Sequence, residues 1–120
     1  MNIQIHTLEG IEIAELQSES KLLQTAADGL DLLGNLYYQG YNKIILHEAN
    51  ISDEFFELKS GMAGEVLQKF SNYRVQLAIV GDFSKFNSKS LDDFIYESNQ
   101  GRLVGFVTNL NEALQFLSRK

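Results

Sequence analysis

The chain has 120 residues, a length typical of one compact domain, and its composition, 44% hydrophobic and 22% charged, is ordinary for a globular protein. With 16 acidic and 10 basic residues the net charge is −6, which argues against non-specific nucleic-acid binding, since that binding depends on Lys and Arg neutralising phosphates. The absence of cysteine excludes disulfides, thiol nucleophiles and thiolate metal sites. We therefore expect a single domain over residues 1–120 that is soluble, cytoplasmic and without a membrane span.

Alternating side chains predict a β-hairpin at the start of the chain. Apolar and polar residues alternate over positions 2–8, which places His6 on the outer, solvated face. Glu9 and Gly10 supply a tight turn, and the alternation resumes over positions 11–13.

A helical period follows over residues 25–39. The apolar stripe of this helix is expected to consist of Ala26, Leu30, Leu33 and Tyr37. Thr25 is expected to be its N-cap, and Gly40 stands where a left-handed residue ends a helix. Gly29 and Gly34 each weaken such a helix by up to about 1 kcal/mol relative to alanine, so packing has to compensate.

The rest of the chain alternates between buried strands and amphipathic helices. Strands are expected over 44–46, 75–80 and 103–107, and helices over 62–70, 90–98 and 109–117. Ser90 and Asn109 are expected to begin the last two helices, because each has an acidic residue three positions later. Strands that alternate with helices require parallel neighbours joined by right-handed crossovers. The predicted order is ββαβαβαβα, an α/β fold whose mixed sheet begins with an antiparallel hairpin.

Ligands and partners of such sheets meet the carboxyl ends of the parallel strands. Two long loops are expected there, over residues 47–60 and 81–90. The candidate residues for binding a partner or an anion in these loops are His47, Ser52, Ser60, Gly61, Asp82 and Ser84.

Ser60 and Gly61 directly precede an amphipathic helix, whose first backbone amides favour an anion. A phosphate, either bound there or attached to Ser60, is compatible with this position. The alternative, which the usual role of serine favours, is that Ser60 caps the helix while Gly61 and Gly64 permit close packing on the sheet.

The remaining loop residues give little indication of catalysis. His47 and Glu48 are expected to point to opposite faces, so they form no obvious acid–base pair, and His47 is more typical of a hydrogen-bonded packing residue. A carboxylate at the position of Asp82 can bind Mg²⁺ or a ribose, but Lys85 and the nearby serines are more typical of a solvated loop. With only His6 and His47 and no cysteine, neither a transition metal nor another cofactor is expected.

Three tyrosines leave two interpretations open. Tyr37, Tyr38 and Tyr41 either form an exposed aromatic patch at an interface, or Tyr37 packs inward while the others cover a strand edge.

Long segments of the chain resemble a family of small bacterial proteins known only as a domain of unknown function. The matching segments are ISDEFFELKSG (51–61), GEVLQKFSNYR (64–74), IVGDFSK (79–85) and SLDDFIYESN (90–99). The similarity spans about residues 45–117 and implies no particular activity.

The order of elements also resembles that of STAS domains, the fold of anti-sigma factor antagonists. These domains place a phosphorylatable serine beside a glycine at the start of the helix after the third strand, where this chain has Ser60 and Gly61. Residues 108–114 resemble the start of their last helix. The chain departs from the pattern at Leu58 and Lys59, where an acidic residue usually stands, and in a longer loop after the third strand. The resemblance implies a STAS-like fold and a regulatory role.

These observations together predict a non-enzymatic regulatory or interaction module that presents the 47–60 loop to a protein partner. The alternative is a small-molecule or anion-binding protein, or a small hydrolase in which His47 and Asp82 face one cleft and the amides at Ser60 hold an anion. A third hypothesis is homodimerisation through the hairpin edge or the tyrosines.

Overall fold

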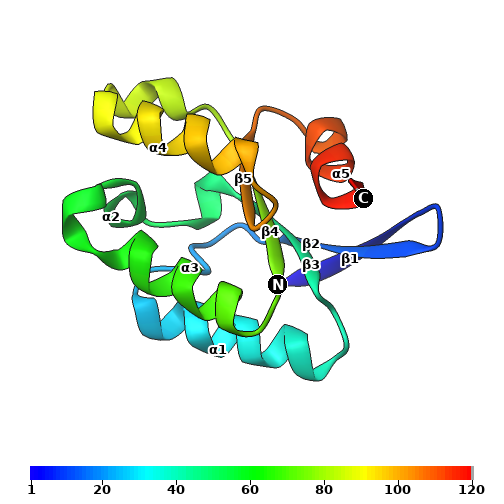
Figure 1. Cartoon of the computed structure of the whole chain (residues 1–120). Helices are drawn as coiled ribbons and strands as arrows, with labels where there is room; N and C mark the ends of the chain where they lie inside the picture. Colours follow the sequence, from blue (N-terminus) through cyan, green and yellow to red (C-terminus); the bar gives the residue numbers. More distant parts are fainter. Residues whose placement is uncertain (120) are drawn as a thin grey trace.

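Five strands form one sheet in the order in which they follow along the chain, β1-β2-β3-β4-β5, in a computed structural model that describes residues 1–119 (Figure 1). They are β1 (Asn2–Leu8), β2 (Ile11–Gln17), β3 (Lys43–His47), β4 (Gln76–Val80) and β5 (Val104–Val107). β1 and β2 are antiparallel, and every other neighbouring pair is parallel. The predicted α/β fold, a hairpin followed by parallel strands, is confirmed.

The hairpin is joined by a two-residue turn in which Glu9 and Gly10 both have positive φ, 53° and 81°. This is the backbone of a type I′ turn, whose twist matches that of the flanking strands. β2 continues past the three residues expected for it, because its next residues, Ala14 and Glu15, pair with Ile44 and Ile45 of β3.

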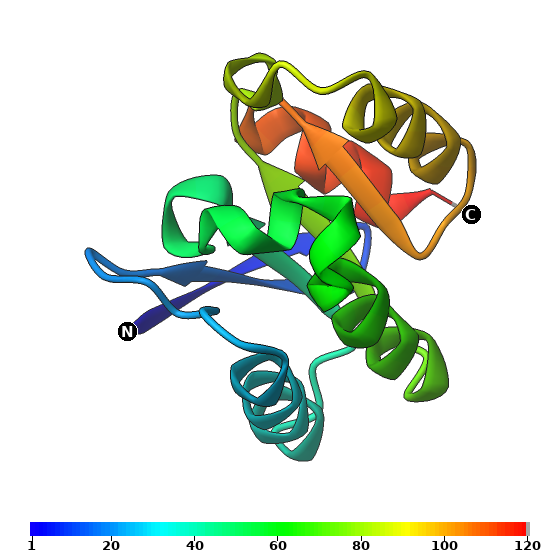
Figure 2. The ribbon, with the colours of Figure 1, turned by 90° about the vertical axis from the view of Figure 1, so that its left-hand side faces the viewer.

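Helices cover both faces of the sheet (Figure 2). On one face, α1 (Ala26–Tyr38), α3 (Met62–Asn72) and α4 (Lys89–Gln100) bury the larger hydrophobic core. On the other face, α5 (Leu110–Ser118) packs against Ile13, Ile45 and Ala78. Short helical turns occupy the two long loops: η1 (Glu48–Asn50), α2 (Asp53–Phe56) and η2 (Leu58–Ser60) follow β3, and η3 (Phe83–Phe86) follows β4.

Thr25 caps α1 as predicted, and its hydroxyl accepts a hydrogen bond from the Asp28 amide at 3.1 Å. The predicted stripe of this helix was partly wrong, since Leu30 and Tyr37 are 41% and 51% exposed. The buried residues are Gly29, Leu33 and Leu36. Gly29 lies so close to Val66 of α3 that an added Cβ would be 2.9 Å from its Cγ2 atom. This close contact turns the 29–33–36 face toward the core, and it is the packing that offsets the low helix propensity of glycine.

The start of α4 also differs from the prediction. Ser88 is the N-cap and accepts a hydrogen bond from the Leu91 amide at 3.1 Å, so Ser90 lies inside the first turn. Asp93 pairs instead with Lys89, 3.1 Å away. The predicted cap of α5 is confirmed, because Asn109 accepts a hydrogen bond from the Glu112 amide at 2.9 Å.

Candidate functional site

The two long loops lie where predicted, after the carboxyl ends of β3 and β4, which run in parallel. Five of the six predicted candidate residues occupy three separate local settings in these loops: Ser60 with Gly61, Asp82 with Ser84, and Ser52. The sixth, His47, is the last residue of β3. The sequence did not reveal two clusters, one that spans β1, β2 and β3 and one that joins the two loops to each other.

Ser60 lies at the end of η2 with its hydroxyl exposed to solvent. Ser60 Oγ donates a hydrogen bond to the Glu54 carbonyl at 2.8 Å and accepts one from the Met62 amide at 3.2 Å. The N-cap of α3 is Gly61, with a left-handed φ of 80°. Gly64 is exposed and has no atom within 4 Å of an added Cβ, so it is not needed for close packing. Ser60 therefore accepts a hydrogen bond from the first backbone amide of α3, as a capping serine does, although it lies one residue before the N-cap.

Asp82 and Ser84 form one local unit at the start of η3. Asp82 Oδ1 accepts hydrogen bonds from the Ser84 hydroxyl at 2.6 Å and from the Ser84 amide at 3.1 Å. The hydroxyl and the amide of Ser84 hold the pKa of this exposed carboxyl below its usual value. Asp82 thus shapes its own turn.

Ser52 connects the first loop to the segment before α1. Its amide donates to the Leu23 carbonyl at 2.9 Å, and its hydroxyl lies 3.5 Å from the Gln24 carbonyl and 3.8 Å from Met62 Sδ. These contacts position the loop against the core.

His47 belongs to a cluster that spans three adjacent strands. The carboxylate of Glu15 on β2 lies between His6 on β1, 2.8 Å from its Nε2, and His47 on β3, 2.6 Å from its Nε2. Glu15 is only 5% exposed. Burial alone would raise the pKa of Glu15, but the hydrogen bonds from the two histidines outweigh it and hold the pKa below its usual value.

The cluster of His6, Glu15 and His47 contradicts the prediction for His6 and agrees with the prediction for His47. His6 is not a solvated residue, because its side chain is 23% exposed and bonded to Glu15. His47 is the hydrogen-bonded packing residue that was expected. Within residues 1–119, no group of three His, Asp or Glu side chains is arranged so that it could hold a metal ion. His47 and Asp82, which the hydrolase hypothesis placed together, are bonded to different partners.

A second cluster joins the two loops to each other. Glu48, 7% exposed, is the first residue of η1, directly after β3, and its Oε2 is 2.6 Å from the ammonium of Lys85 on η3. That ion pair is the polar contact of this buried oxygen in the described part of the chain. Contact with the carboxylate raises the pKa of Lys85, which is therefore more than a solvated loop residue. Gly81 makes room for the pair, since a Cβ there would be 2.4 Å from that of Glu48.

A cavity of about 510 Å³ opens between the two loops, and we refer to it as the rim pocket. It is lined by Asp53, Phe56, Glu57, Leu58, Lys59, Lys85, Phe86, Ser88 and Ser90. The rings of Phe56 and Phe86 are stacked with their centroids 4.6 Å apart, so one aromatic pair joins the walls contributed by the two loops. The lining combines this aromatic surface with charged and hydroxyl side chains.

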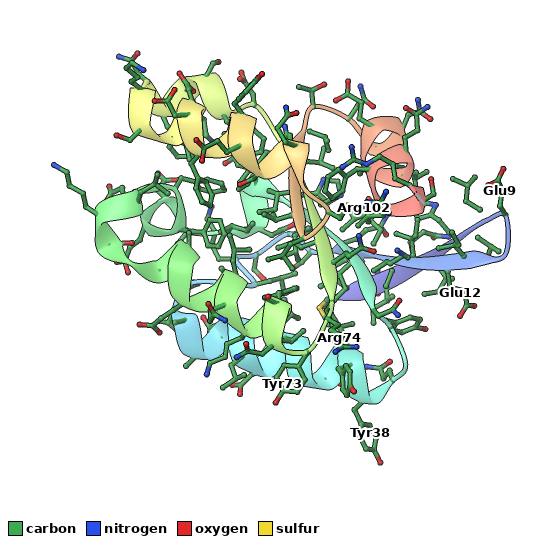
Figure 3. The ribbon with its side chains drawn as sticks, in the orientation of Figure 1. Glu9, Glu12, Tyr38, Tyr73, Arg74 and Arg102 are labelled. Atoms are coloured by element: carbon green, nitrogen blue, oxygen red, sulfur yellow. The ribbon has the colours of Figure 1, made fainter. Side chains whose placement is uncertain are left out.

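Tyr38, the last residue of α1, and Tyr73, which follows α3, lie at the end of the molecule away from the two long loops (Figure 3). Tyr38 is 92% exposed, and the ring of Tyr37 lies 5.3 Å from that of Tyr73. Tyr41 is half-buried. Neither of the two interpretations holds in full: Tyr37 is exposed and does not pack inward, while Tyr41 packs against the larger core and takes no part in an exposed patch.

A comparison with known families matches residues 8–117 to the domain of unknown function DUF4180. The chain belongs to this family. The match confirms the resemblance seen in the sequence and extends it to include β2 and α1. No curated protein and no solved structure matches this DUF4180 chain. Among residues 1–119, no helix has the length and hydropathy needed to cross a bilayer.

Proposed function

We propose that this DUF4180 chain is a non-enzymatic regulatory module of the bacterial cytoplasm that binds a protein partner at the rim pocket. The observation that carries the proposal is that both long loops at the carboxyl edge of the sheet line one cavity. Phe86 and Leu58 offer apolar contact surface, while Asp53 and Lys59 are charged and exposed. An apolar centre within a polar rim is typical of protein-binding surfaces.

Ser60 supplies a means of regulating this surface. Its hydroxyl donates to the Glu54 carbonyl, and residues 57–59, which follow Glu54, form one wall of the pocket. A phosphate ester on Ser60 Oγ removes that donor and brings negative charge toward a carbonyl oxygen, so this wall has to move. The same phosphate adds a charge of about −1.5 to −2 beside the first amides of α3, where a helix favours an anion. Phosphorylation would therefore change both the shape and the charge of the rim pocket.

The topology supports a STAS-like fold as part of this proposal. A hairpin precedes the parallel strands, and α3 begins directly after the Ser60–Gly61 pair. This is the position at which STAS domains, which the chain resembles, carry their phosphorylatable serine. Leu58 and Lys59 replace the usual acidic residue, so a kinase that modifies Ser60 would have to accept a lysine before it.

The test is capture of protein partners from a bacterial lysate with matched variants. Ser90 is exposed on the first turn of α4 and lines the pocket, so Ser90→Arg fills the opening while keeping a good helix former. We expect the wild type and Ser60→Ala to retain a partner that Ser60→Asp and Ser90→Arg lose. Gln115→Arg, exposed on α5, is the control for added charge and should retain the partner.

Two results would contradict the proposal. A partner that Ser90→Arg and Gln115→Arg capture equally well does not use the rim pocket. Intact-mass measurement of the protein purified from its host, with no phosphorylated fraction under any growth condition, would remove the regulatory role of Ser60.

A further inference from the structure

The two edges of the sheet differ in how well their outward-facing backbone groups are covered. At the β5 edge, the side chain of Asn99 on α4 forms the backbone hydrogen bonds that a neighbouring strand would otherwise form. Its Oδ1 accepts a hydrogen bond from the Phe106 amide at 2.7 Å, and its Nδ2 donates to the Phe106 carbonyl at 3.1 Å. β5 is also only four residues long. Short strands and covered backbone groups are the usual means by which proteins prevent pairing at a sheet edge.

The β1 edge has no such protection. β1 is seven residues long and pairs with β2 without a bulge. It contains no proline, lysine, arginine or carboxylate, and its one titratable side chain, His6, is held by Glu15. Among residues 1–119, the outer side of β1 receives no backbone hydrogen bond from another segment. A long, uncharged edge without a bulge is a template for another strand.

The turn determines which residues of β1 face outward. In a hairpin with a two-residue turn, the pair that flanks the turn, here Leu8 and Ile11, exchanges both of its hydrogen bonds. Such pairs alternate along the ladder, so the amides and carbonyls of Ile3, Ile5 and Thr7 point away from β2. The Gln4 side chain, 3.4 Å from the Ile5 carbonyl, covers this row only weakly.

We propose that β1 pairs with β1 of a second copy of the chain, antiparallel and centred on Ile5. In this register Ile5 faces Ile5, and Ile3 faces Thr7, so all outward-facing residues pair with one another. The three pairs supply about six main-chain hydrogen bonds, two for each pair. Ile3 and Ile5 are half-buried in the single chain, and the second strand would cover them further.

This pairing closes at two copies. The contact is isologous, since the same strand is used on both sides, and Asn99 blocks the opposite edge from extending the sheet. A single pair of edge strands is a small interface, so we expect a dissociation constant on the order of 10–100 μM. Each copy carries a net charge of −6 while β1 itself is free of carboxylates, so rising salt should strengthen the dimer. The dimer leaves the rim pocket free and does not depend on the proposed function.

The test uses the central residue of β1. Ile5→Lys places two like charges directly opposite each other in the dimer, and Ile5→Glu does the same with the other sign. Sedimentation of the full chain between about 5 and 500 μM should show a wild-type dimer, with each variant alone dimerising at least 10-fold more weakly. An equimolar mixture of the two variants should dimerise again, because a Lys then faces a Glu. Gln115→Lys, on exposed α5, should dimerise like the wild type.

Other outcomes would overturn the proposal. These are a wild type that stays monomeric at 500 μM, a dimer that withstands Ile5→Lys, and a mixture of folded variants that fails to recover. Circular dichroism shows whether each variant is folded. If the Ile5 variants unfold, Thr7→Lys at an exposed position of the same row provides the test and should also weaken the dimer at least 10-fold. Asn99→Ala should convert the dimer into larger assemblies, since it uncovers the second edge.

Discussion

Replacement of Glu15 by glutamine tests the energetic role of the cluster that joins β1, β2 and β3. The carboxylate accepts from His6 at 2.8 Å and from His47 at 2.6 Å while 5% exposed. Hydrogen bonds to a charged group contribute about 1.5–3 kcal/mol each, and a neutral one about 1 kcal/mol. Glutamine keeps one neutral acceptor of similar shape, so Glu15→Gln should lower the free energy of unfolding by about 2–5 kcal/mol at pH 7.

The pH dependence gives an independent signature. The pKa of Glu15 is lower in the folded chain than in the unfolded chain. Its contribution is therefore fully present above the unfolded pKa, near 4.5, and is lost as the pH falls through the folded value. The wild type should lose stability in this acidic range, and Glu15→Gln should lack that part of the loss.

Urea unfolding between pH 3 and pH 8, followed by circular dichroism, measures both effects. Glu12→Gln is the matched control, because it removes the same charge from the same strand at an exposed site (Figure 3) and should change stability by less than about 0.5 kcal/mol. The reasoning fails if Glu15→Gln unfolds at the same urea concentration as Glu12→Gln across the whole range.

Three glycines give further predictions from thermal or urea unfolding. Gly34→Ala, on an open surface of α1, should stabilise the chain by up to about 1 kcal/mol. Gly29→Ala in the same helix should instead destabilise the chain, because the new Cβ would lie 2.9 Å from Val66. Equal effects of these two variants would contradict the close packing of α1 on α3. Gly81→Ala should destabilise by about 1–3 kcal/mol, since its Cβ would be 2.4 Å from that of Glu48, and the double variant with Glu48→Gly should recover part of that loss.

Most of the fold could be predicted from the sequence because its signals are local. Alternation over β1, the helical period of α3 and the caps at Thr25 and Asn109 each depend on residues within one or two turns of each other. The exposed face of α1 was predicted wrongly because the contact between Gly29 and Val66 joins positions far apart in the sequence.

The candidate site was harder to predict for the same reason. Glu15 is separated from His47 by 32 positions, and only the register of β2 against β3 brings them together. A signal was present, since Glu15 continues the inward-facing row of Ile11 and Ile13, where a carboxylate needs a partner. The pair of Glu48 and Lys85 left no such trace, because both residues lie in loops whose periodicity carries no information about contacts.

The strand order of the sheet, identical to the order along the chain, also affects how the protein can be assembled during translation. Each strand after β1 pairs with the strand that was synthesised immediately before it. The sheet can therefore grow one strand at a time, at one edge, as the chain is translated. Such sequential pairing keeps loop-closure distances short, which favours rapid folding. Asn99 is synthesised just before β5. Its side chain is therefore available to bind the Phe106 amide when β5 pairs with β4.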